Sequence, residues 1–235
     1  MQLIVLASGR GSRLKKLTKK IPKCLIKVRS KSIIDYISRN FKKFDQTIIL
    51  TGYKSELINK KFPEIKKIKN EKYMSTNMVY SLFCAKKYIK QDLIISYSDI
   101  IFDHRIIDEM INIKKTHIPL NKNWLSLWKK RMDENRINDD AEDLLINNNK
   151  VLSIGKKILA KRPKLQFMGL IKIKYQDFIK LYKYFNTLND TKIDMTSFLN
   201  NAIENKIINL GYFKTSKYWF EIDNIKDRKV AEKYL

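Results

Sequence analysis

Short apolar runs alternate, along the first half of the chain, with segments whose hydrophobic residues recur every three or four positions. The runs predict buried strands, and the wider spacing predicts helices. The predicted strands are Gln2–Ala7, 47–51 and Leu93–Tyr97, and the predicted helices are 32–44, 54–61, 78–89 and 104–114. Strands that alternate with helices pair in parallel through right-handed crossovers, so this half predicts an α/β fold.

The pattern changes after about residue 116. The later predicted strands are 142–147, 151–155, 165–173 and 207–213, and the later predicted helices are 176–185, 195–205 and Ile225–Tyr234. Asn147-Asn148-Asn149 predicts a hairpin turn between the first two of these strands, and Asp194 is the expected N-cap of the helix that follows it. Because no Pro- or Gly-rich linker divides the chain, we expect one domain spanning residues 1–235.

Composition indicates a globular protein, since 44% of the 235 residues are hydrophobic. No apolar run is long enough to span a bilayer, and the first residues enter a strand without the features of a signal peptide. Two cysteines, Cys24 and Cys84, are too few for a disulfide framework. We therefore expect a cytoplasmic protein with reduced cysteines.

Charge adds an alternative to this picture. Lys and Arg number 49 against 24 Asp and Glu, which gives a formal net charge of +25. Such a surface attracts polyanions, so a basic nucleic-acid-binding protein is one interpretation. The lysines are spread along the chain, however, and Lys, Ile and Asn are abundant together, which favours compositional drift in an AT-rich genome. Nucleic acid is therefore not the expected partner.

The loop after the first predicted strand contains Gly9 and Gly11, followed by Arg13 and, ten residues further on, Lys23. Glycines in such a loop let backbone N–H groups approach a phosphate chain closely, and the two cations add to the same site. The loop lacks the third glycine of the dinucleotide fingerprint and the Gly-Lys-Ser/Thr ending of the P-loop. The residues alone therefore indicate a nucleoside-triphosphate site of another kind.

The wider pattern resembles the signature of the nucleotidyltransferases that activate sugar phosphates and phosphocholine. It reads Gly9-x-Gly11-x-Arg13-x3-Leu17-Thr18-x3-Pro22-Lys23. The resemblance implies a single Rossmann-like, glycosyltransferase-A-like domain with a mixed, mostly parallel sheet flanked by helices. Residues 1–115 would then form the nucleotide-binding half and residues 116–235 the acceptor-binding half.

The same resemblance implies roles for the loop. The backbone of Ala7, Ser8, Gly9 and Gly11 would hold the base and the phosphates. Arg13 would contact the phosphates that leave as pyrophosphate, and Lys23 would contact the α-phosphate, where charge shifts in the transition state. Charged groups placed around a transferring phosphoryl group are the main catalytic contribution in such chemistry.

Asp99 ends a buried strand, where a carboxylate is costly unless it is paired or bound to a metal. The resembling enzymes place a Mg²⁺-binding aspartate after this strand. Their phosphocholine-type branch has a second one in a Trp-x-Glu-Ile-Asp segment, which Trp219-Phe220-Glu221-Ile222-Asp223 matches. We therefore predict Asp99 and Asp223 as ligands of a Mg²⁺ cofactor. The alternatives are a strand-end cap for Asp99 and an N-cap of the last helix for Asp223.

Acceptor contacts are predicted from the same branch. Asn77-x-x-Tyr80-Ser-Leu is similar to cytidylyltransferases that use phosphocholine or 2-aminoethylphosphonate, which makes Asn77 a nucleotide contact and Tyr80 an acceptor contact. The alternative is that this segment caps a helix through Ser75 or Thr76 and packs in the core.

A Trp-x-x-Arg segment that faces the acceptor in that branch is matched here by Trp128 and Arg131. Trp128 could pack on an alkylammonium group and Arg131 could hold the acceptor's phosphoryl group. Glu142 could meet a positive head group, and Lys156 could anchor the phosphoryl group. Core packing, an exposed acidic pair and a surface lysine are the respective alternatives.

The prediction is a Mg²⁺-dependent nucleotidyltransferase. An acceptor's phosphate or phosphonate oxygen attacks the α-phosphorus, and pyrophosphate leaves. CTP is favoured by the branch resemblance, and the acceptor is expected to be a small amino-phosphoryl compound such as phosphocholine or 2-aminoethylphosphonate. A sugar-1-phosphate nucleotidyltransferase is the first alternative. Gly155, which stands where those enzymes usually carry the Glu of a Glu-Lys-Pro segment, argues against it.

Overall fold

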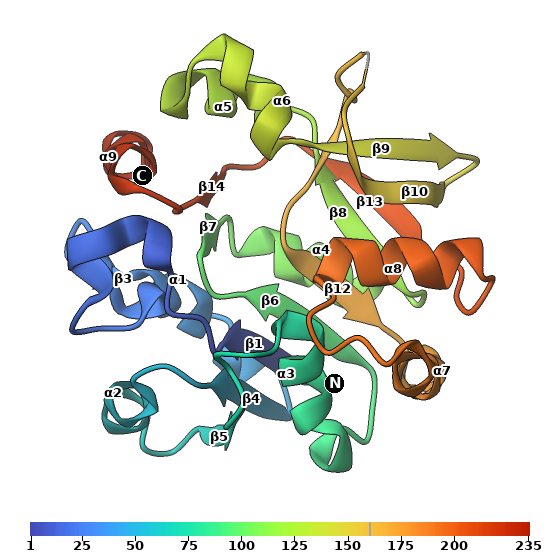
Figure 1. The fold of residues 1–235 in the computed structure, drawn as a ribbon, viewed down its shortest axis with the longest axis horizontal. Helices are drawn as coiled ribbons and strands as arrows, with labels where there is room; N and C mark the ends of the chain where they lie inside the picture. Colours follow the sequence, from blue (N-terminus) through green and yellow to red (C-terminus); the bar gives the residue numbers. More distant parts are fainter. Residues whose placement is uncertain (160) are drawn as a thin grey trace.

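A ten-stranded mixed sheet runs through the computed structural model of this protein, which describes residues 1–159 and 161–235 (Figure 1). Its strands lie in the order β5-β4-β1-β6-β12-β8-β13-β10-β9, with β11 paired to β8. Their bounds are β1 Gln2–Ala7, β4 Gln46–Thr51, β5 Lys66–Lys69, β6 Leu93–Tyr97, β8 His117–Asn121, β9 Glu142–Asn147, β10 Lys150–Lys157, β11 Gln166–Phe167, β12 Leu170–Ile173 and β13 Gly211–Thr215. The expected mixed α/β sheet is thus confirmed.

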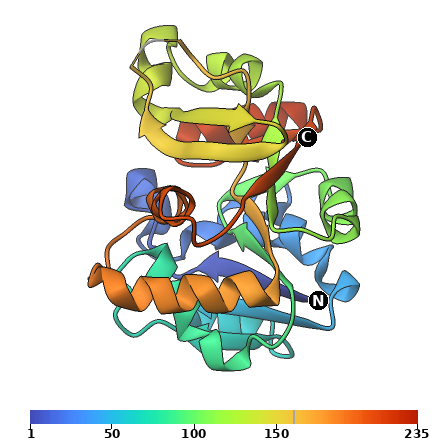
Figure 2. The same ribbon diagram turned by 90° about the vertical axis from the view of Figure 1, so that its right-hand side faces the viewer.

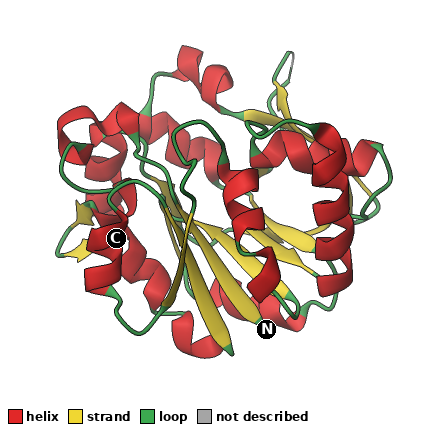
Figure 3. Ribbon diagram, turned by 60° about the horizontal axis from the view of Figure 1, so that its bottom comes forward, coloured by secondary structure: helices red, strands yellow, loops and turns green. Residues whose placement is uncertain are grey.

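Helices cover both faces of this sheet (Figure 3). They are α1 Ile33–Ser38, α2 Ser55–Lys61, α3 Met78–Cys84, α4 Arg105–Asn112, α5 Trp124–Arg131, α6 Ile137–Asp140, α7 Tyr175–Leu188, α8 Met195–Glu204 and α9 Ile225–Tyr234. Two small strand pairs lie outside the sheet: β2 Lys27–Val28 with β3 Lys31–Ser32, and β7 Ile100–Phe102 with β14 Trp219–Glu221. Within the described residues, no helix is both long enough and apolar enough to cross a membrane.

Parallel pairing is found where the strands and helices alternate. β5, β4, β1 and β6 run in parallel, and Val5 lies between Ile49 and Ser96 in the register. β12 then pairs antiparallel with β6, and the second half continues antiparallel except for β8 beside β13. The second half therefore extends the sheet of the first, as the absence of a linker predicts.

The central strands are buried on both faces because each face carries its own core. Ile4 and Leu6 of β1 pack with α3, α7 and α8, whereas Leu3, Val5 and Ala7 pack with α1, α4 and α5. A strand covered on both sides has no polar face, which is why it appears in the sequence as a continuous apolar run.

Several predicted bounds differ from the structure. The strand expected at 165–173 is divided into β11 and β12 at Gly169, whose φ of +74° a residue with a side chain rarely adopts. The helices expected at 32–44 and 78–89 end at Ser38 and Cys84, and 3₁₀ turns follow each. The strand expected at 207–213 is found at Gly211–Thr215, and the short strands β5, β7, β8 and β14 were not predicted.

The β9–β10 hairpin is confirmed at the predicted turn. Asn148 and Asn149 both have positive φ, 44° and 60°, as a two-residue type I′ turn requires. Figure 2 shows this hairpin with α5 and α6 at the top of the molecule and the parallel strands at the bottom. Asn200 of α8 accepts a hydrogen bond from the backbone N–H of Ile154, which fastens the helix to the hairpin.

The β7–β14 pair brings together the two segments that carry Asp99 and Asp223. Phe220 pairs with Ile101, and the N–H of Ile222 donates to the carbonyl of Asp99 at 2.9 Å. Asp223 therefore lies next to the strand end that carries Asp99, although the two residues are far apart in sequence.

Candidate active site

The loop after β1 is held in one conformation by its surroundings. The Ser8 carbonyl accepts a hydrogen bond from the N–H of Tyr53, and the Ser8 hydroxyl donates to the carbonyl of Thr51. Gly11 has a φ of +72°, and a Cβ built there would lie 2.7 Å from Cβ of Lys23. Only glycine fits this position, so the loop packs directly against the lysine.

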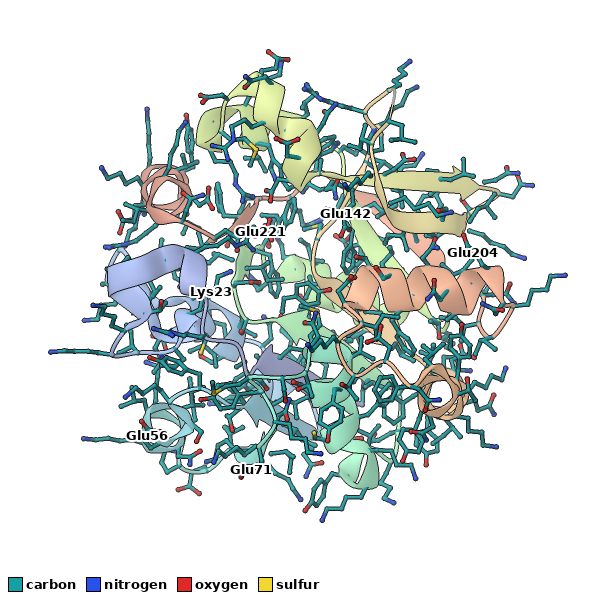
Figure 4. The ribbon with its side chains drawn as sticks, viewed as in Figure 1. Lys23, Glu56, Glu71, Glu142, Glu204 and Glu221 are labelled. Carbon is teal, nitrogen blue, oxygen red and sulfur yellow. The ribbon has the colours of Figure 1, made fainter. Side chains whose placement is uncertain are left out.

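The predicted catalytic and metal-binding residues meet in one cluster. Lys23 Nζ lies 2.7 Å from Asp99 Oδ2 and 2.5 Å from Asp223 Oδ1. Arg13 Nη2 lies 3.0 Å from the same Asp223 oxygen. Figure 4 shows Lys23 among the chain's first loops and Glu221 on the neighbouring β14 segment. Four residues chosen from distant parts of the sequence thus share one site.

Mutual attraction keeps these groups charged. Burial alone would lower the pKa of Lys23, but the facing carboxylates of Asp99 and Asp223 raise it above its usual value. Burial would likewise raise the pKa of Asp223, but Lys23 and then Arg13 hold it below its ordinary value. Lys23 and Asp223 are therefore both ionised at neutral pH.

The same carboxylates fit a divalent cation. Asp99 Oδ1 is buried and has no hydrogen-bond partner in the described part of the chain. The Lys23 ammonium lies between Asp99 and Asp223, which shows that this point stabilises positive charge. Carboxylate oxygens are the ligands that Mg²⁺ prefers, so the donor set is suitable.

A second acidic group lies nearby but is already neutralised in part. Oxygens of Asp140, Glu221 and Asp223 lie within 4.8 Å of one another. The Arg131 guanidinium approaches Glu221 at 3.0 Å and Asp140 at 3.4 Å. Arg131 therefore balances part of the negative charge of this group.

A cavity lies beside the loop, between the end of β6 and the start of α3, and we call it the loop cavity. Its lining residues are Leu6, Ser8, Gly9, Gly11, Lys23, Tyr73, Thr76, Asn77, Met78, Ser81, Tyr97, Ser98 and Asp99. Most residues predicted to bind the nucleotide are therefore in its wall. Ala7 is not, because its side chain is buried under the loop.

Asn77 is the N-cap of α3, where Ser75 or Thr76 was the predicted alternative. Its Oδ1 accepts a hydrogen bond from the N–H of Met78 at 2.8 Å, and its Nδ2 donates to the carbonyl of Lys192. Tyr80 lines neither this cavity nor the next. Positions 77, 78 and 81 share one face of the helix, and position 80 lies off that face.

A second cavity adjoins the first and shares Met78 and Tyr97 with it. We call it the acidic cavity, because four of its side chains are carboxylates. Its other lining residues are polar, apolar or aromatic, and no described lining residue is Lys, Arg or His. The full lining is Met78, Tyr97, Ile100, Trp128, Asp140, Glu142, Gln166, Phe167, Met168, Gly169, Asp194, Met195, Thr196, Trp219 and Glu221.

The pKa values of Glu142 and Glu221 respond to the negative charge gathered in this cavity. Burial, reinforced by the charges of Asp194 and Asp140, raises the pKa of Glu142, although Thr196 Oγ1 donates to its carboxylate at 2.7 Å. Burial and then the charge of Asp223 raise the pKa of Glu221 to about 8. Such shifts indicate negative potential that the protein itself does not fully balance.

Arg131 is placed differently from the prediction. Its side chain is 5% exposed and is absent from the lining of the acidic cavity. Its Nε donates to Asp227 at 2.9 Å and its Nη1 to Glu221 at 3.0 Å, and its Cζ lies 4.9 Å from the ring centre of Trp128. The guanidinium thus joins α5, β14 and α9 through contacts with protein side chains.

Lys156 lines neither cavity. Its ammonium pairs with Glu204 of α8 at 2.8 Å, and its side chain is 57% exposed. Glu204 lies on α8 away from the centre of the molecule (Figure 4). The surface alternative describes this lysine, because β10 turns at Gly155 (φ +84°) and directs it outward.

The prediction missed several cavity residues. Glu221 and Trp219 lie in the segment that identified Asp223, so a signal for both was present. Thr196, Gln166 and Tyr97 carried no signal, because each comes to the site through sheet pairing or helix docking rather than through a motif.

The sequence is similar to those of known nucleotidyltransferases. A family model described as "Nucleotidyl transferase" matches residues 2–136. The CTP:phosphoglutamine cytidylyltransferase of Campylobacter jejuni is 35% identical over 98% of this chain and 98% of its own length.

Solved structures show the same fold. The CTP:phosphocholine cytidylyltransferase of Streptococcus pneumoniae superposes with a TM-score of 0.77 at 19% identity, over 99% of this chain and 97% of that one. The inositol-1-phosphate CTP transferase of T. maritima superposes with a TM-score of 0.76 at 20% identity, over 99% of this chain and 95% of that one.

Proposed function

The chain belongs to the nucleotidyl transferase family, and from that premise we propose that it is a cytoplasmic, divalent-metal-dependent cytidylyltransferase. An oxygen of a small phosphorylated acceptor forms a bond to the α-phosphorus of CTP. The bond from that phosphorus to the bridging oxygen of the β-phosphate breaks, and pyrophosphate leaves with the electron pair. The observation that carries this proposal is the convergence of Lys23, Arg13, Asp99 and Asp223 in one ion-paired cluster, of which Lys23 and Asp99 line the loop cavity.

CTP is the nucleotide that the relatives support. The full-length relative and both structural neighbours are named for CTP. The base would lie in the loop cavity against the loop backbone and Asn77, whose amide also caps α3. A fixed amide at this point adds hydrogen-bonding groups to a wall that also contains the side chains of Tyr73, Met78 and Tyr97.

Lys23 and Arg13 take the phosphate roles. When a triphosphate enters, Lys23 exchanges a carboxylate contact for the α-phosphate, and Arg13, whose side chain is 67% exposed, reaches the leaving phosphates. Asp99 and Asp223 would hold the metal ion, which neutralises phosphate charge when it is bound. Fixed cations that await developing charge lower the barrier because they need no reorganisation at the moment of reaction.

The acceptor is a small amino-phosphoryl compound such as phosphocholine or 2-aminoethylphosphonate, bound in the acidic cavity beside the α-phosphate. Trp128 and Glu142 are in the lining of that cavity. Tyr80, Arg131 and Lys156 have no direct part in this proposal, because none of them lines it. A sugar acceptor is not favoured, since Thr196 fills the space beside Gly155 where a side chain would otherwise reach the sugar.

Pyrophosphate release is the decisive test. Each of four nucleoside triphosphates is combined with phosphocholine, phosphoethanolamine, 2-aminoethylphosphonate and sugar phosphates, and we expect release with CTP and an amino-phosphoryl acceptor. Lys23→Ala and Asp99→Asn should each lower kcat by about 100-fold or more, the order expected when a group that stabilises transition-state charge is removed. Lys43→Ala, which removes a lysine paired with Asp108 outside the site, should leave it unchanged. Full activity in either active-site variant would refute the role assigned to that residue.

A further inference from the structure

The acidic cavity contains more negative charge and more hydrogen-bond acceptors than its own side chains balance. Arg131 neutralises two of its four carboxylates in part, and Asp194 is satisfied by N–H and O–H donors at the start of α8. Glu142 is different. It accepts a hydrogen bond from Thr196, and no cation lies within ion-pair distance of it in the described part of the chain.

Gln166 is a second, independent sign of a missing donor. Its side chain is 4% exposed and lines the cavity, and its Oε1 has no hydrogen-bond partner among the described residues. Buried acceptors are normally paired, so a ligand that brings N–H groups would satisfy this one. The indole N–H of Trp219 also lacks a partner and suits an oxygen of the same ligand.

The aromatic wall offers less to a cation without N–H groups. The Arg131 guanidinium lies 4.9 Å from the ring centre of Trp128. The ring of Trp124 packs edge-on against the ring of Trp128, with 5.3 Å between their centres. The protein's own cation therefore uses the cation–π capacity of the ring that was expected to hold an alkylammonium group.

We propose that the acceptor ends in an ammonium group that carries N–H bonds and has no carboxylate beside it, and that Glu142 and Gln166 select it. The inference rests on the proposed function and narrows its acceptor to aminoalkyl phosphates and phosphonates. A trimethylammonium group brings no donor, so it would leave both side chains unpaired. An amino-acid carboxylate would face four carboxylates with no basic side chain in the described lining.

The test measures kcat/KM by pyrophosphate release at saturating CTP and Mg²⁺. The acceptors are phosphoethanolamine, 2-aminoethylphosphonate, phosphocholine, phosphoglutamine and ethyl phosphate, which has no amine. We expect the two aminoethyl compounds to exceed each of the others at least tenfold. Glu142→Gln should lower their values at least tenfold and change that of ethyl phosphate less than threefold.

Asp143→Asn is the matched control. It removes the same charge from the neighbouring residue of β9, which does not line the cavity, so the acceptor ranking should not change. If Glu142→Gln fails to fold, the wild-type ranking and the Glu142→Asp variant, which keeps the charge, still decide the matter.

The outcomes separate the two proposals. Equal or higher efficiency with phosphocholine or phosphoglutamine overturns the ammonium selectivity and leaves the cytidylyltransferase assignment intact. An unchanged ranking in Glu142→Gln overturns the role of that residue. Absence of release with every nucleotide and acceptor overturns the proposed function itself, and this inference with it.

Discussion

At the scale of single residues, the proposed reaction requires one lysine to make two different sets of contacts in turn. Lys23 now bridges Asp99 and Asp223, and the proposed reaction needs it at the α-phosphate. In the proposed mechanism its ammonium and a divalent ion compete for the same carboxylates. The ion pairs with Lys23 would then keep the two acidic residues neutralised until nucleotide and metal bind.

Removing that ammonium should make metal binding easier in the absence of nucleotide. Lys23→Met leaves Asp99 and Asp223 without their bridging cation. Because the ammonium no longer competes for these carboxylates, we expect Mn²⁺ to bind about tenfold more tightly than to the unmodified protein, a difference of ~1.4 kcal/mol in binding free energy. Electron paramagnetic resonance of free Mn²⁺ measures this directly. Lys43→Met should bind as the unmodified protein does, and a weaker affinity in Lys23→Met would contradict the competition.

The loop glycines make a second prediction at this scale. An alanine at position 11 meets Lys23 at 2.7 Å and must adopt a φ of +72°, whereas an alanine at position 9 has no atom within 4 Å of its Cβ. Gly11→Ala should therefore lower the free energy of unfolding by about 1–3 kcal/mol, and Gly9→Ala should leave it nearly unchanged. Chemical denaturation compares them, and equal values for the two variants would contradict the close packing of loop and lysine.

At the scale of elements, strand ends and helix ends are completed by side chains from distant segments. Lys172 of β12 is buried and donates to the carbonyls of Met110, Ile111 and Ile113 at 3.1, 3.0 and 2.6 Å. These carbonyls lie at the end of α4, where backbone acceptors have no partner within the helix. One ammonium thus joins a helix end to the central sheet.

Loss of this ammonium should destabilise the fold. Lys172→Met keeps the length of the side chain but leaves buried carbonyls without a donor, so the free energy of unfolding should fall by about 2–4 kcal/mol. Lys183→Met on the exposed side of α7 is the control and should change it by less than about 0.5 kcal/mol. Urea unfolding monitored by tryptophan fluorescence measures both variants. Equal unfolding midpoints for Lys172→Met and Lys183→Met would show that water hydrogen-bonds to the carbonyls in place of the lysine.

At the scale of the whole molecule, stability should depend on pH through a buried histidine. His117 of β8 is 2% exposed, lies opposite Lys172 in the sheet, and has a buried Nε2 without a partner in the described chain. Burial, with a smaller contribution from Lys172, lowers the pKa of His117 below 6.5. The folded state therefore binds fewer protons than the unfolded chain once pH falls below about 6.5.

Protonation of His117 at acidic pH therefore lowers the stability of the folded state. Stability is constant with respect to this group above pH 6.5, where it is neutral in both states, and declines as the pH falls from 6.5 towards the folded pKa. We expect Tm to fall between pH 7.5 and 5.5. In His117→Gln, the free energy of unfolding should fall by about 1 kcal/mol less over the same pH range. His104, which is exposed beside Asp103, supplies the control His104→Gln. An identical pH profile for both variants would contradict the assignment.

The sequence determined the elements and residues whose signals are local. The apolar run of β1, the Asn-Asn turn of the hairpin and the glycine loop with Arg13 and Lys23 each follow from neighbouring residues, because strand burial, turn conformation and phosphate approach are short-range requirements. The sequence also predicted that Asp99 and Asp223 share one site, since each lies in a motif of its own, and both contact Lys23 in the structure.

Tertiary structure alone decided how distant segments meet. Three features depend on pairings between segments far apart in the chain: β14 pairs with β7, Arg131 contacts Glu221 and Asp227, and Gln166 and Glu142 line one cavity. No local pattern specifies such pairings, because their free energy comes from packing and charge balance in the assembled fold. The cluster around Lys23 is therefore visible in the sequence, whereas most of the lining of the acidic cavity is visible only in the structure.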